Sequence, residues 1–367
     1  MAKLGEVCLL KAGKFVSAND ISPEYNKGLY PCFGGNGIRG YVADYTHDGE
    51  FPLIGRQGAL CGNVNLASGK FHATEHAVVV QPKIEMNVHW LYYALNAMNL
   101  GQYATGAAQP GLAVSKLETL SIEIPNISEQ NKIAQTLYKV EQLVNFRKQQ
   151  LEKLDDLVKA RFVEMFGNPK DNKKEWNRVS LKKVAEVRGR VGWKGYKKED
   201  LQESGPLVLG ATHLTENGNI DLSSPVYLSR DKYKESPEIM LHRNDLVFTQ
   251  RGNTIGKVGL VKEDIGEATI NPCVLILRPT NIHPIYLDVY FIMDEVKKDM
   301  WRLNAGSAQP MITQKGISEY LLMLPPIELQ NQFAAFVERV DKQKQIVQQS
   351  LEKLELMKKA LMQEYFG

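Results

Sequence analysis

Cysteine is scarce in this chain of 367 residues, and long apolar runs are missing. The four cysteines, Cys8, Cys32, Cys61 and Cys273, stand singly, with no C-x-x-C pair and no histidine cluster beside them. This spacing argues against a zinc site and a disulfide framework, and it favours buried or incidental thiols. No apolar run approaches the ~18 residues of a membrane span, and the N-terminus lacks the apolar core of a signal peptide. We therefore expect a cytoplasmic protein with no membrane contact.

An excess of one charge is also missing, because 45 Lys and Arg face 42 Asp and Glu. The resulting net charge of +3 is compatible with nucleic-acid binding but does not require it. With 43% hydrophobic and 24% charged residues, the composition is that of an ordinary globular protein. A chain of this length is sufficient for two or three hydrophobic cores.

The most informative feature is an internal repeat. Residues 106–167 align with residues 306–367 without a gap, at a constant offset of 200, and 20 positions are identical. The matches include Gly106-Ala-Ala-Gln-Pro110 with Gly306-Ser-Ala-Gln-Pro310, Leu151-Glu-Lys-Leu154 with Leu351-Glu-Lys-Leu354, and Phe166-Gly167 with Phe366-Gly367. Solenoid units span ~20–50 residues, so this longer period indicates that a whole module, a domain plus a helix, occurs twice.

Each copy is predicted to end in a long helix. Apolar residues recur mostly three or four apart from Ile133 to Met165 and from Phe333 to Tyr365. Neither run contains Gly or Pro before its final Gly, which is a good stop signal. Such a helix, with ~38 residues and a length of ~57 Å, is several times longer than a small domain needs to cover its own core. Because the apolar stripe is narrow, as in a coiled coil, we expect the two helices to pack on each other.

The remaining parts, residues 1–105 and 168–305, resemble each other much less. Both are rich in Gly, Val, Ile and Tyr with frequent turn signals, which is typical of α/β domains with short strands. One faint correspondence joins the segment 56–64, RQGALCGNV, to the segment 250–258, QRGNTIGKV. Its glycines would let the backbone turn tightly and approach a ligand closely. We infer a constant scaffold that carries two readers of different targets.

No complete catalytic motif is present. Residues 35–40, GNGIRG, match G-x-G-x-x-G, but β-like and turn-rich residues follow where a helix N-terminus would have to bind a pyrophosphate. Asn168-Pro169 and Asn271-Pro272 lack the second proline and the aromatic residue of the adenine-methyltransferase motif. His72 and His76 have no evident third metal ligand, so no metal site is expected. Any catalysis must therefore come from a partner.

The order of these features resembles the specificity subunit of type I restriction–modification systems. That order is a domain, Gly-x-Ala-Gln-Pro, a short apolar segment ending in Pro, Gln-Asn and a long helix, followed by the same series again. Residues 30–41, YPCFGGNGIRGY, with residues 54–58, IGRQG, and 61–64, CGNV, are similar to a common version of that family's target-recognition domain. The resemblance covers nearly the whole chain.

The resemblance implies an α+β protein with two α/β target-recognition domains in tandem (1–125 and 168–325), separated by two long helices (126–167 and 326–367) packed as an antiparallel coiled coil. It implies a non-catalytic DNA specificity subunit for methylation and phage defence, in which each domain reads half of a bipartite asymmetric site on double-stranded DNA. The helices would set the spacing and dock two methyltransferase subunits, through which restriction subunits join where present. This chain would bind no cofactor, because S-adenosylmethionine is expected in the methyltransferase.

The residues expected to dock the partners are the repeated glutamines and apolar residues of the helices: Gln130, Leu137, Val140, Leu151, Leu154, Gln330, Val337, Val340, Leu351 and Leu354. Base readout needs bidentate side chains, chiefly Arg or Lys for guanine and Asn or Gln for adenine. The candidates for it are Arg39, Arg56 and Gln57 in the first domain, and Arg188, Arg190, Lys194, Arg251, Asn253 and Lys257 in the second. Gln109 and Gln309 occur in both copies, so we expect them to touch the DNA backbone or to brace the junction of domain and helix.

Residues 173–198 contain ten Lys or Arg and two Glu, with Trp176, Trp193 and Tyr196 among them. Such a run is a candidate for phosphate binding, and a solvated surface is the competing interpretation. The first domain has eight Lys or Arg and eight Asp or Glu in residues 1–105, so we expect partner subunits to supply much of the nonspecific affinity.

Three other functions stay open from the sequence. A standalone methyltransferase or nuclease is disfavoured by the lack of a complete motif. A coiled-coil scaffold that binds only proteins would be distinguished by the absence of salt-dependent DNA binding. A specificity subunit that serves a fused restriction–methylation enzyme is also compatible with the sequence.

Overall fold

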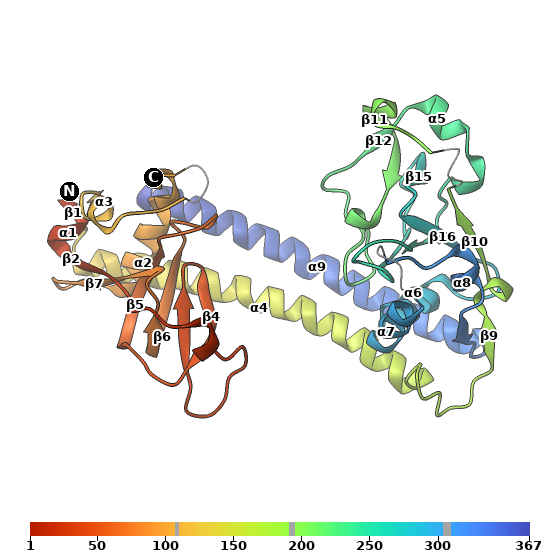
Figure 1. The fold of residues 1–367 in the computed structure, drawn as a ribbon, viewed down its shortest axis with the longest axis horizontal. Helices are drawn as coiled ribbons and strands as arrows, with labels where there is room; N and C mark the ends of the chain where they lie inside the picture. The colour runs from red at the N-terminus through yellow and green to blue at the C-terminus, as the bar shows by residue number, and fades with distance from the viewer. Residues whose placement is uncertain (107–109, 191–194, 304–309) are drawn as a thin grey trace. The chain divides into compact units, whose positions relative to one another are not determined.

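The computed structural model describes residues 1–106, 110–190, 195–303 and 310–367. The chain divides into two compact units (Figure 1). Unit 1 comprises Met1–Lys148 and Gln349–Gly367, and unit 2 comprises Gln149–Gln348. Each unit therefore contains about half of each of two 40-residue helices, α4 (Ile127–Phe166) and α9 (Ile327–Phe366). Within the described ranges, no helix is long and apolar enough to cross a membrane.

Unit 1 is built on a six-stranded mixed sheet of order β2-β7-β5-β6-β3-β4, in which only β3 and β6 are parallel neighbours. Helix α2 packs on β5 and β6, and the short pair β1–β8 leads into α4. The elements before α4 are β1 (Ala2–Lys3), α1 (Leu4–Val7), β2 (Cys8–Ala12), β3 (Tyr30–Gly34), β4 (Gly37–Val42), β5 (His47–Gly55), β6 (Val64–Ala73), β7 (Ala77–Pro82), α2 (Val88–Ala97), α3 (Val114–Glu118) and β8 (Ser121–Ile122).

Unit 2 contains a four-stranded sheet of order β10-β16-β13-β14 and a three-stranded sheet of order β12-β11-β15. The short pair β17–β9 leads into α9. Its elements are β9 (Arg178–Ser180), β10 (Ala185–Gly189), β11 (Leu201–Leu209), β12 (Tyr227–Leu228), α5 (Arg230–Lys234), β13 (Leu246–Thr249), β14 (Val258–Leu260), β15 (Ala268–Ile270), β16 (Val274–Pro279), α6 (Pro284–Ile292), α7 (Asp294–Arg302), α8 (Gln314–Ser318) and β17 (Leu321–Met323).

The two units share a four-stranded antiparallel core in the same order. Strands β2-β7-β5-β6 of unit 1 correspond to β10-β16-β13-β14 of unit 2. The register also agrees, because Cys8 pairs with Pro82 at the end of β7, and Ala185 pairs with Pro279 at the end of β16. The aliphatic runs of β7 and β16 are buried, as expected of inner strands, and the proline is the last residue of each. We call residues at equivalent positions of the two units twins.

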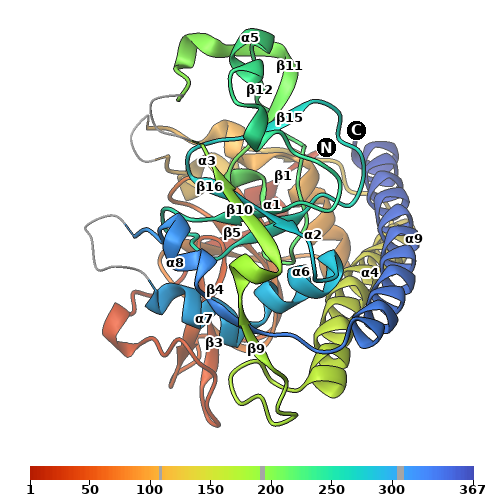
Figure 2. The ribbon, with the colours of Figure 1, turned by 90° about the vertical axis from the view of Figure 1, so that its right-hand side faces the viewer.

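The two long helices pack against each other in opposite directions within each unit. In unit 1, Glu141 of α4 pairs with Lys358 of α9, and Lys148 pairs with Glu355. In unit 2, Asp155 of α4 pairs with Lys344 of α9. Figures 1 and 2 show α4 and α9 side by side. The predicted fold class, two α/β domains with long helices in an antiparallel coiled coil, is confirmed.

Most of the ten helix residues predicted to dock partners lie inside the units. Leu137 is fully buried in the core of unit 1, and Val337 and Val340 lie in the core of unit 2. The residues that are buried are Gln130, Leu137, Val140, Gln330, Val337, Val340 and Leu351, and those that are half-buried are Leu151, Leu154 and Leu354. A side chain that is a few per cent exposed contacts its own chain, so the seven buried residues pack within the units. The half-buried Leu151, Leu154 and Leu354 stay candidates for docking, as do other helix residues.

Gln130 and Gln330 instead hold each domain to the start of its helix. The side-chain oxygen of Gln130 accepts a hydrogen bond from the backbone N–H of Asn87 (2.9 Å), just before α2, and its amide donates to Pro125 O (2.8 Å). Gln330 makes the same two bonds, to His283 N and Pro325 O, both at 2.8 Å. The repeated glutamine is therefore explained by packing, because it satisfies backbone groups where two elements meet.

Asp288 on α6 is a buried carboxyl of unit 2. It is 5% exposed, and its Oδ1 has no hydrogen-bond partner among the described residues. Burial raises the pKa of this carboxyl from its ordinary 3.8 to about 7, although Lys262 and Lys344 oppose the rise. The folded state therefore keeps a proton that the unfolded chain releases above pH 4, and the stability of unit 2 falls as the pH rises from about 4 to 7.

We expect Asp288→Asn to remove this pH dependence. The rise in pKa corresponds to about 4 kcal/mol, and an unpaired amide costs about 1–3 kcal/mol, so the variant is about 1–3 kcal/mol more stable at pH 8. At pH 4, where the carboxyl is protonated, only the cost of the amide remains, so the variant should be about 1–3 kcal/mol less stable than the original protein. Urea unfolding at both pH values measures this, and an equal difference at pH 4 and pH 8 would contradict the assignment.

Candidate nucleic-acid interface

The loops that follow β5 and β13 are twins, residue by residue. Gly58 N donates to Pro110 O (3.1 Å), and Gly252 N donates to Pro310 O (3.0 Å). A second bond of 2.9 Å holds each loop: Leu112 N donates to Arg56 O in unit 1, and Ile312 N donates to Gln250 O in unit 2. The faint sequence correspondence is thus a shared backbone structure, which we call the paired loops (residues 56–63 and 250–257).

The glycines of the paired loops are required by backbone geometry. Gly58 and Gly252 have φ of 87° and 98°, and Gly62 and Gly256 have φ of 93° and 85°. These left-handed values are strained for other residues. A Cβ on Gly62 would also lie 2.2 Å from Gly101 N. The loop conformation is therefore fixed by its glycines and by the proline of the Gly-x-Ala-Gln-Pro element.

One position of the paired loops presents a different polar side chain to solvent in each unit. Gln57 and Arg251 are twins, and both are exposed. Among the described residues, the Arg251 guanidinium makes one hydrogen bond, 3.3 Å to Met311 Sδ. Asn253, two residues further on, is exposed as well, whereas Arg56 is half-buried. The structure thus brings five of the predicted residues onto two equivalent loops, and among these five the side chains of Gln57, Arg251 and Asn253 are exposed.

Arg39 lies on β4, on the far edge of the unit 1 sheet. Its side chain is exposed and makes no hydrogen bond or ion pair among the described residues. Phe15, in the loop after β2, was not predicted from the sequence, and its side chain is 76% exposed. A large exposed aromatic suits stacking on a base or sugar. Exposure depends on the tertiary structure, so no sequence signal marked this residue.

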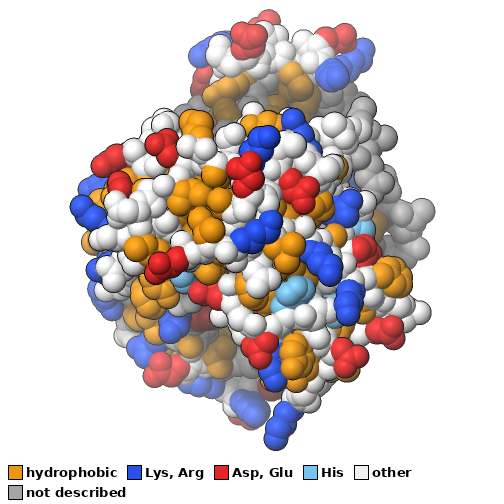
Figure 3. All heavy atoms as spheres, turned by 90° about the vertical axis from the view of Figure 1, so that its left-hand side faces the viewer, with side chains coloured by type: hydrophobic (Ala, Val, Ile, Leu, Met, Phe, Trp, Pro, Cys, Tyr) orange, Lys and Arg blue, Asp and Glu red, His pale blue; other side chains and the backbone are white. Residues whose placement is uncertain are grey.

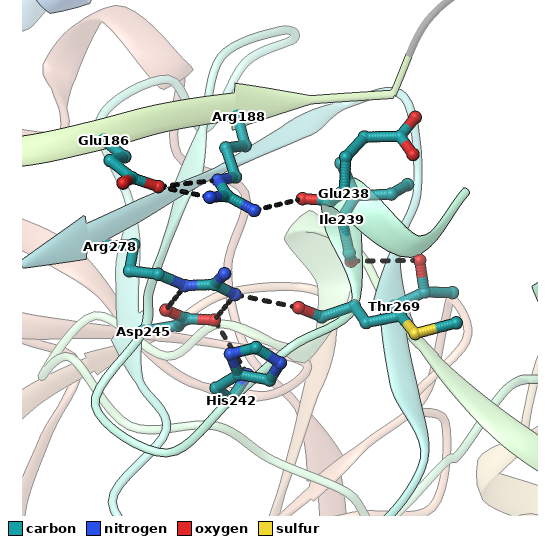
Figure 4. A network of polar contacts seen from close by, with 9 residues as sticks. Glu186, Arg188, Glu238, Ile239, His242, Asp245, Thr269 and Arg278 are labelled. Atoms are coloured by element: carbon teal, nitrogen blue, oxygen red, sulfur yellow. Dashed lines mark hydrogen bonds and ion pairs between the residues drawn. The ribbon is translucent and has the colours of Figure 1, made fainter.

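Arg188 is held by the protein on strand β10. Its guanidinium forms an ion pair with Glu186 and donates to Glu238 O at 3.1 Å (Figure 4). Because these contacts use donors of the Arg188 guanidinium, Arg188 has fewer free donors for DNA than an arginine without protein partners. The neighbouring pair Arg278–Asp245 lies deeper, with Asp245 fully buried.

Arg190 and Lys257 are engaged inside unit 2. Arg190 is 8% exposed, donates to Ile270 O (3.0 Å) and Thr269 Oγ1 (3.1 Å), and its burial lowers the pKa of the guanidinium. Lys257 forms an ion pair with Glu216 at 3.0 Å. For Arg190, contact with DNA would require the side chain to leave this pocket. The remaining candidate, Lys194, lies outside the described residues, as do Trp193, Gln109 and Gln309.

The basic run 173–198 is used in part for packing. Trp176 donates its indole N–H to Phe166 O at 2.8 Å, and Lys174 donates to Glu164 O at 2.8 Å, so both cover the end of α4. The ring of Tyr196 lies under Arg190, 5.3 Å from its guanidinium carbon. Arg178 is exposed and donates to Pro169 O at 2.9 Å, and Lys197 pairs with Glu199. Among the described residues of this run, the exposed cations without such a partner are Lys173, Lys182, Lys183 and Lys198.

Charges of both signs lie intermingled on the surface of unit 1 that carries α1. Figure 3 displays this face, on which Lys and Arg side chains alternate with Asp and Glu. The equal numbers of basic and acidic residues in this part of the sequence are thus mixed in space on that face. Mixed charge of this kind gives weak nonspecific attraction to DNA.

The cysteines and histidines form no reactive centre within the described residues. Cys8, Cys32 and Cys61 are buried, and burial raises the pKa of each thiol, that of Cys8 to about 11. These thiols are therefore neutral at physiological pH and poor nucleophiles. Among the described residues, no group of three or more His, Cys, Asp or Glu could hold a metal ion.

The family model, the sequence relatives and the solved structures that resemble this chain all belong to type I restriction–modification systems. The family model described as "Type I restriction modification DNA specificity domain" matches residues 1–155 and 173–356. The EcoprrI specificity subunit of a type I restriction enzyme from Escherichia coli is 53% identical over 143 residues. That alignment covers 39% of this chain and only 36% of the relative's own length.

Two solved structures have the same fold over the whole chain. A type I restriction–modification S subunit from M. genitalium matches with a TM-score of 0.62 and 17% identity, covering 100% of this chain and 95% of that one. A chain from a study of complex assembly and conformational transition of the type I R-M system matches with a TM-score of 0.54 and 15% identity, covering 100% and 96%. At these identities the likeness concerns the fold.

Proposed function

Because the chain belongs to the family of type I restriction modification DNA specificity domains, we propose that it reads the two halves of a bipartite asymmetric DNA site for a methyltransferase complex. The observation that carries this proposal is the pair of twin loops. The same backbone hydrogen bonds present Gln57 in unit 1 and Arg251 in unit 2. A duplicated reader with different side chains at one exposed position suits two half-sites of different sequence.

The long helices dock two methyltransferase subunits in this proposal and set the spacing between the half-sites. Two pairs of exposed apolar side chains on the helices are related by the offset of 200. Phe146 is 60% exposed and its counterpart Ile346 is 68% exposed, and Leu157 (46%) corresponds to Met357 (51%). Each unit has one residue from each pair, so two equivalent apolar surfaces are available for two copies of one partner.

The chain itself contributes recognition and no catalysis in this proposal. The partner methyltransferase binds S-adenosylmethionine and transfers the methyl group, and restriction subunits join the complex through it where they are present. The buried thiols of Cys8, Cys32 and Cys61 fit this division of roles, because a neutral thiol is a poor nucleophile.

Modified-base sequencing tests the proposal directly. Cells that express the chain with the methyltransferase encoded beside it are compared with cells that lack only this chain. The expected result is a split asymmetric motif that is methylated only when the chain is present. An unchanged pattern of methylation would overturn the proposed function and favour a scaffold that binds only proteins.

We expect Arg251→Ala to relax or abolish recognition of one half-site and to leave partner assembly intact. The loss of a bidentate contact to a base costs about 1–3 kcal/mol, which weakens binding about 5- to 150-fold. The measurement is methylation at that half-site, with co-purification of the methyltransferase as the control. Unchanged methylation there would remove Arg251 from the interface.

A further inference from the structure

In unit 1 the glycine-rich GNGIRG segment forms a hairpin whose tip lies on the paired loop. Strands β3 and β4 pair as far as Gly34 and Gly37, so Gly35 and Asn36 form a two-residue turn. Gly37 has φ of 93°, and a Cβ on Gly35 would lie 3.3 Å from Gln57 O. The glycines therefore let the turn come close to the backbone of the loop that carries Gln57.

Two asparagine side chains join the hairpin to the loop. Asn63 Nδ2 donates a hydrogen bond of 2.7 Å to Asn36 Oδ1. Asn63 is the last residue of its paired loop, and two bonds fix its backbone, from Gly55 N to Asn63 O (2.8 Å) and from Asn63 N to Leu60 O (3.1 Å). Both asparagines are exposed, and neither side chain makes another hydrogen bond among the described residues. We call these two residues the asparagine pair.

The bond inside the asparagine pair leaves one donor group and one acceptor group for a ligand. Asn36 keeps its NH2 group as a donor, and Asn63 keeps its Oδ1 as an acceptor. In the major groove adenine offers an acceptor, N7, beside a donor, the N6 amino group. Guanine offers two acceptors, cytosine one donor and thymine one acceptor. Of the four bases, adenine alone therefore matches both free groups of the pair.

Unit 2 has a different arrangement at the equivalent position. The twin of Asn63 is Lys257, whose ammonium group forms an ion pair with Glu216 at 3.0 Å. Strand β14, the twin of β6, is the edge of its four-stranded sheet, whereas β3 and β4 continue the sheet of unit 1 beyond β6. The asparagine pair is therefore a property of unit 1, and any contact that it makes with DNA belongs to one half-site.

We propose that Asn36 and Asn63 together read one adenine in the half-site of unit 1, beside the base that Gln57 reads. Asn36 Nδ2 donates to adenine N7, and Asn63 Oδ1 accepts from the N6 amino group. This inference rests on the proposed function, because it assigns a further specificity-determining contact to the same DNA interface. The competing explanation is that the bond between the two asparagines only fastens the hairpin to the loop.

Asn36→Asp separates these two explanations. The carboxylate still accepts the hydrogen bond from Asn63, so the hairpin stays fastened, but an oxygen replaces the free NH2 group, and this oxygen repels adenine N7 and suits the amino group of cytosine. The chain, assembled with its methyltransferase, is used to select from duplexes of random sequence, and the bound duplexes are sequenced. At one base pair of the first half-site, the preference for adenine over cytosine should fall about 5- to 150-fold. Asn26→Asp is the matched control, because it makes the same change at an exposed residue ahead of β3, and it should keep the original motif.

A second variant tests whether the two asparagines act together. Asn63→Ala removes the acceptor, so it should weaken the preference for adenine at the same base pair that Asn36→Asp changes. Unchanged selection by both variants, changes at two different base pairs, or an equal loss of binding to all sequences would each overturn this proposal and leave the proposed function standing. If the original chain selects no bipartite motif, the proposed function fails, and the adenine contact fails with it.

Discussion

Gln57→Arg is expected to change the first half of the methylated motif so that a G·C pair replaces an A·T pair, and Arg251→Gln is expected to do the reverse in the second half. Glutamine pairs with adenine through two hydrogen bonds, and arginine does so with guanine. Each wrong pairing costs about 1–3 kcal/mol, so each variant should prefer the new site to the former one by about 5- to 150-fold. Modified-base sequencing of cells with each variant measures the result.

The twin geometry makes this exchange interpretable. Both side chains leave a loop whose backbone is fixed by the same bonds, from Gly58 to Pro110 and from Gly252 to Pro310. Each substitution therefore places in one unit the side chain that the other unit already carries. Gln81→Arg on β7 is a matched control, because it makes the same change on an exposed residue away from the loop. If both loop variants keep the original motif at the original rate, the position does not read bases.

The two long helices could be predicted from the sequence because their signals are local. The spacing of apolar residues and the terminal Phe166-Gly167 and Phe366-Gly367 are properties of neighbouring residues, and the helices end at Phe166 and Phe366. The pairing of the strands is not local. Strands β7 and β16 share little beyond aliphatic residues and a final proline, so the common four-strand order became visible only in the structure.

In the candidate site, too, local features could be predicted from the sequence and contacts between distant residues could not. The paired loops could be found in the sequence because a left-handed φ demands glycine at fixed spacing, as at Gly58 and Gly62. The environment of a single arginine or tryptophan depends on elements far away in the chain. Arg190 bonds to residues about 80 positions later, and Trp176 bonds to a helix end ten positions earlier. The basic and aromatic composition of residues 173–198 therefore did not indicate which of these side chains face solvent.

The ion pair between Asp245 and Arg278 is expected to carry the largest single stability effect in unit 2. Asp245 is fully buried just before β13, and its two oxygens accept from Arg278 Nε (2.8 Å) and Nη2 (2.7 Å). Its Oδ2 also accepts from His242 N at 2.8 Å (Figure 4). Because β13 leads into the loop of Arg251, this pair holds the strand from which that loop starts.

We expect Asp245→Ala to lower the free energy of unfolding of unit 2 by about 3–5 kcal/mol, because a half-buried guanidinium loses its counter-charge and a backbone N–H loses its acceptor. Glu186→Ala is the matched control, since it removes the more exposed ion pair with Arg188 on the neighbouring strand and should cost at most about 1 kcal/mol. Urea unfolding followed by amide exchange in β13 and β16 measures both. Equal losses in the two variants would mean that burial gives the Asp245–Arg278 pair no special weight. A large loss confined to Asp245→Ala, together with lost methylation at the half-site of Arg251, would tie recognition by this loop to the buried pair behind it.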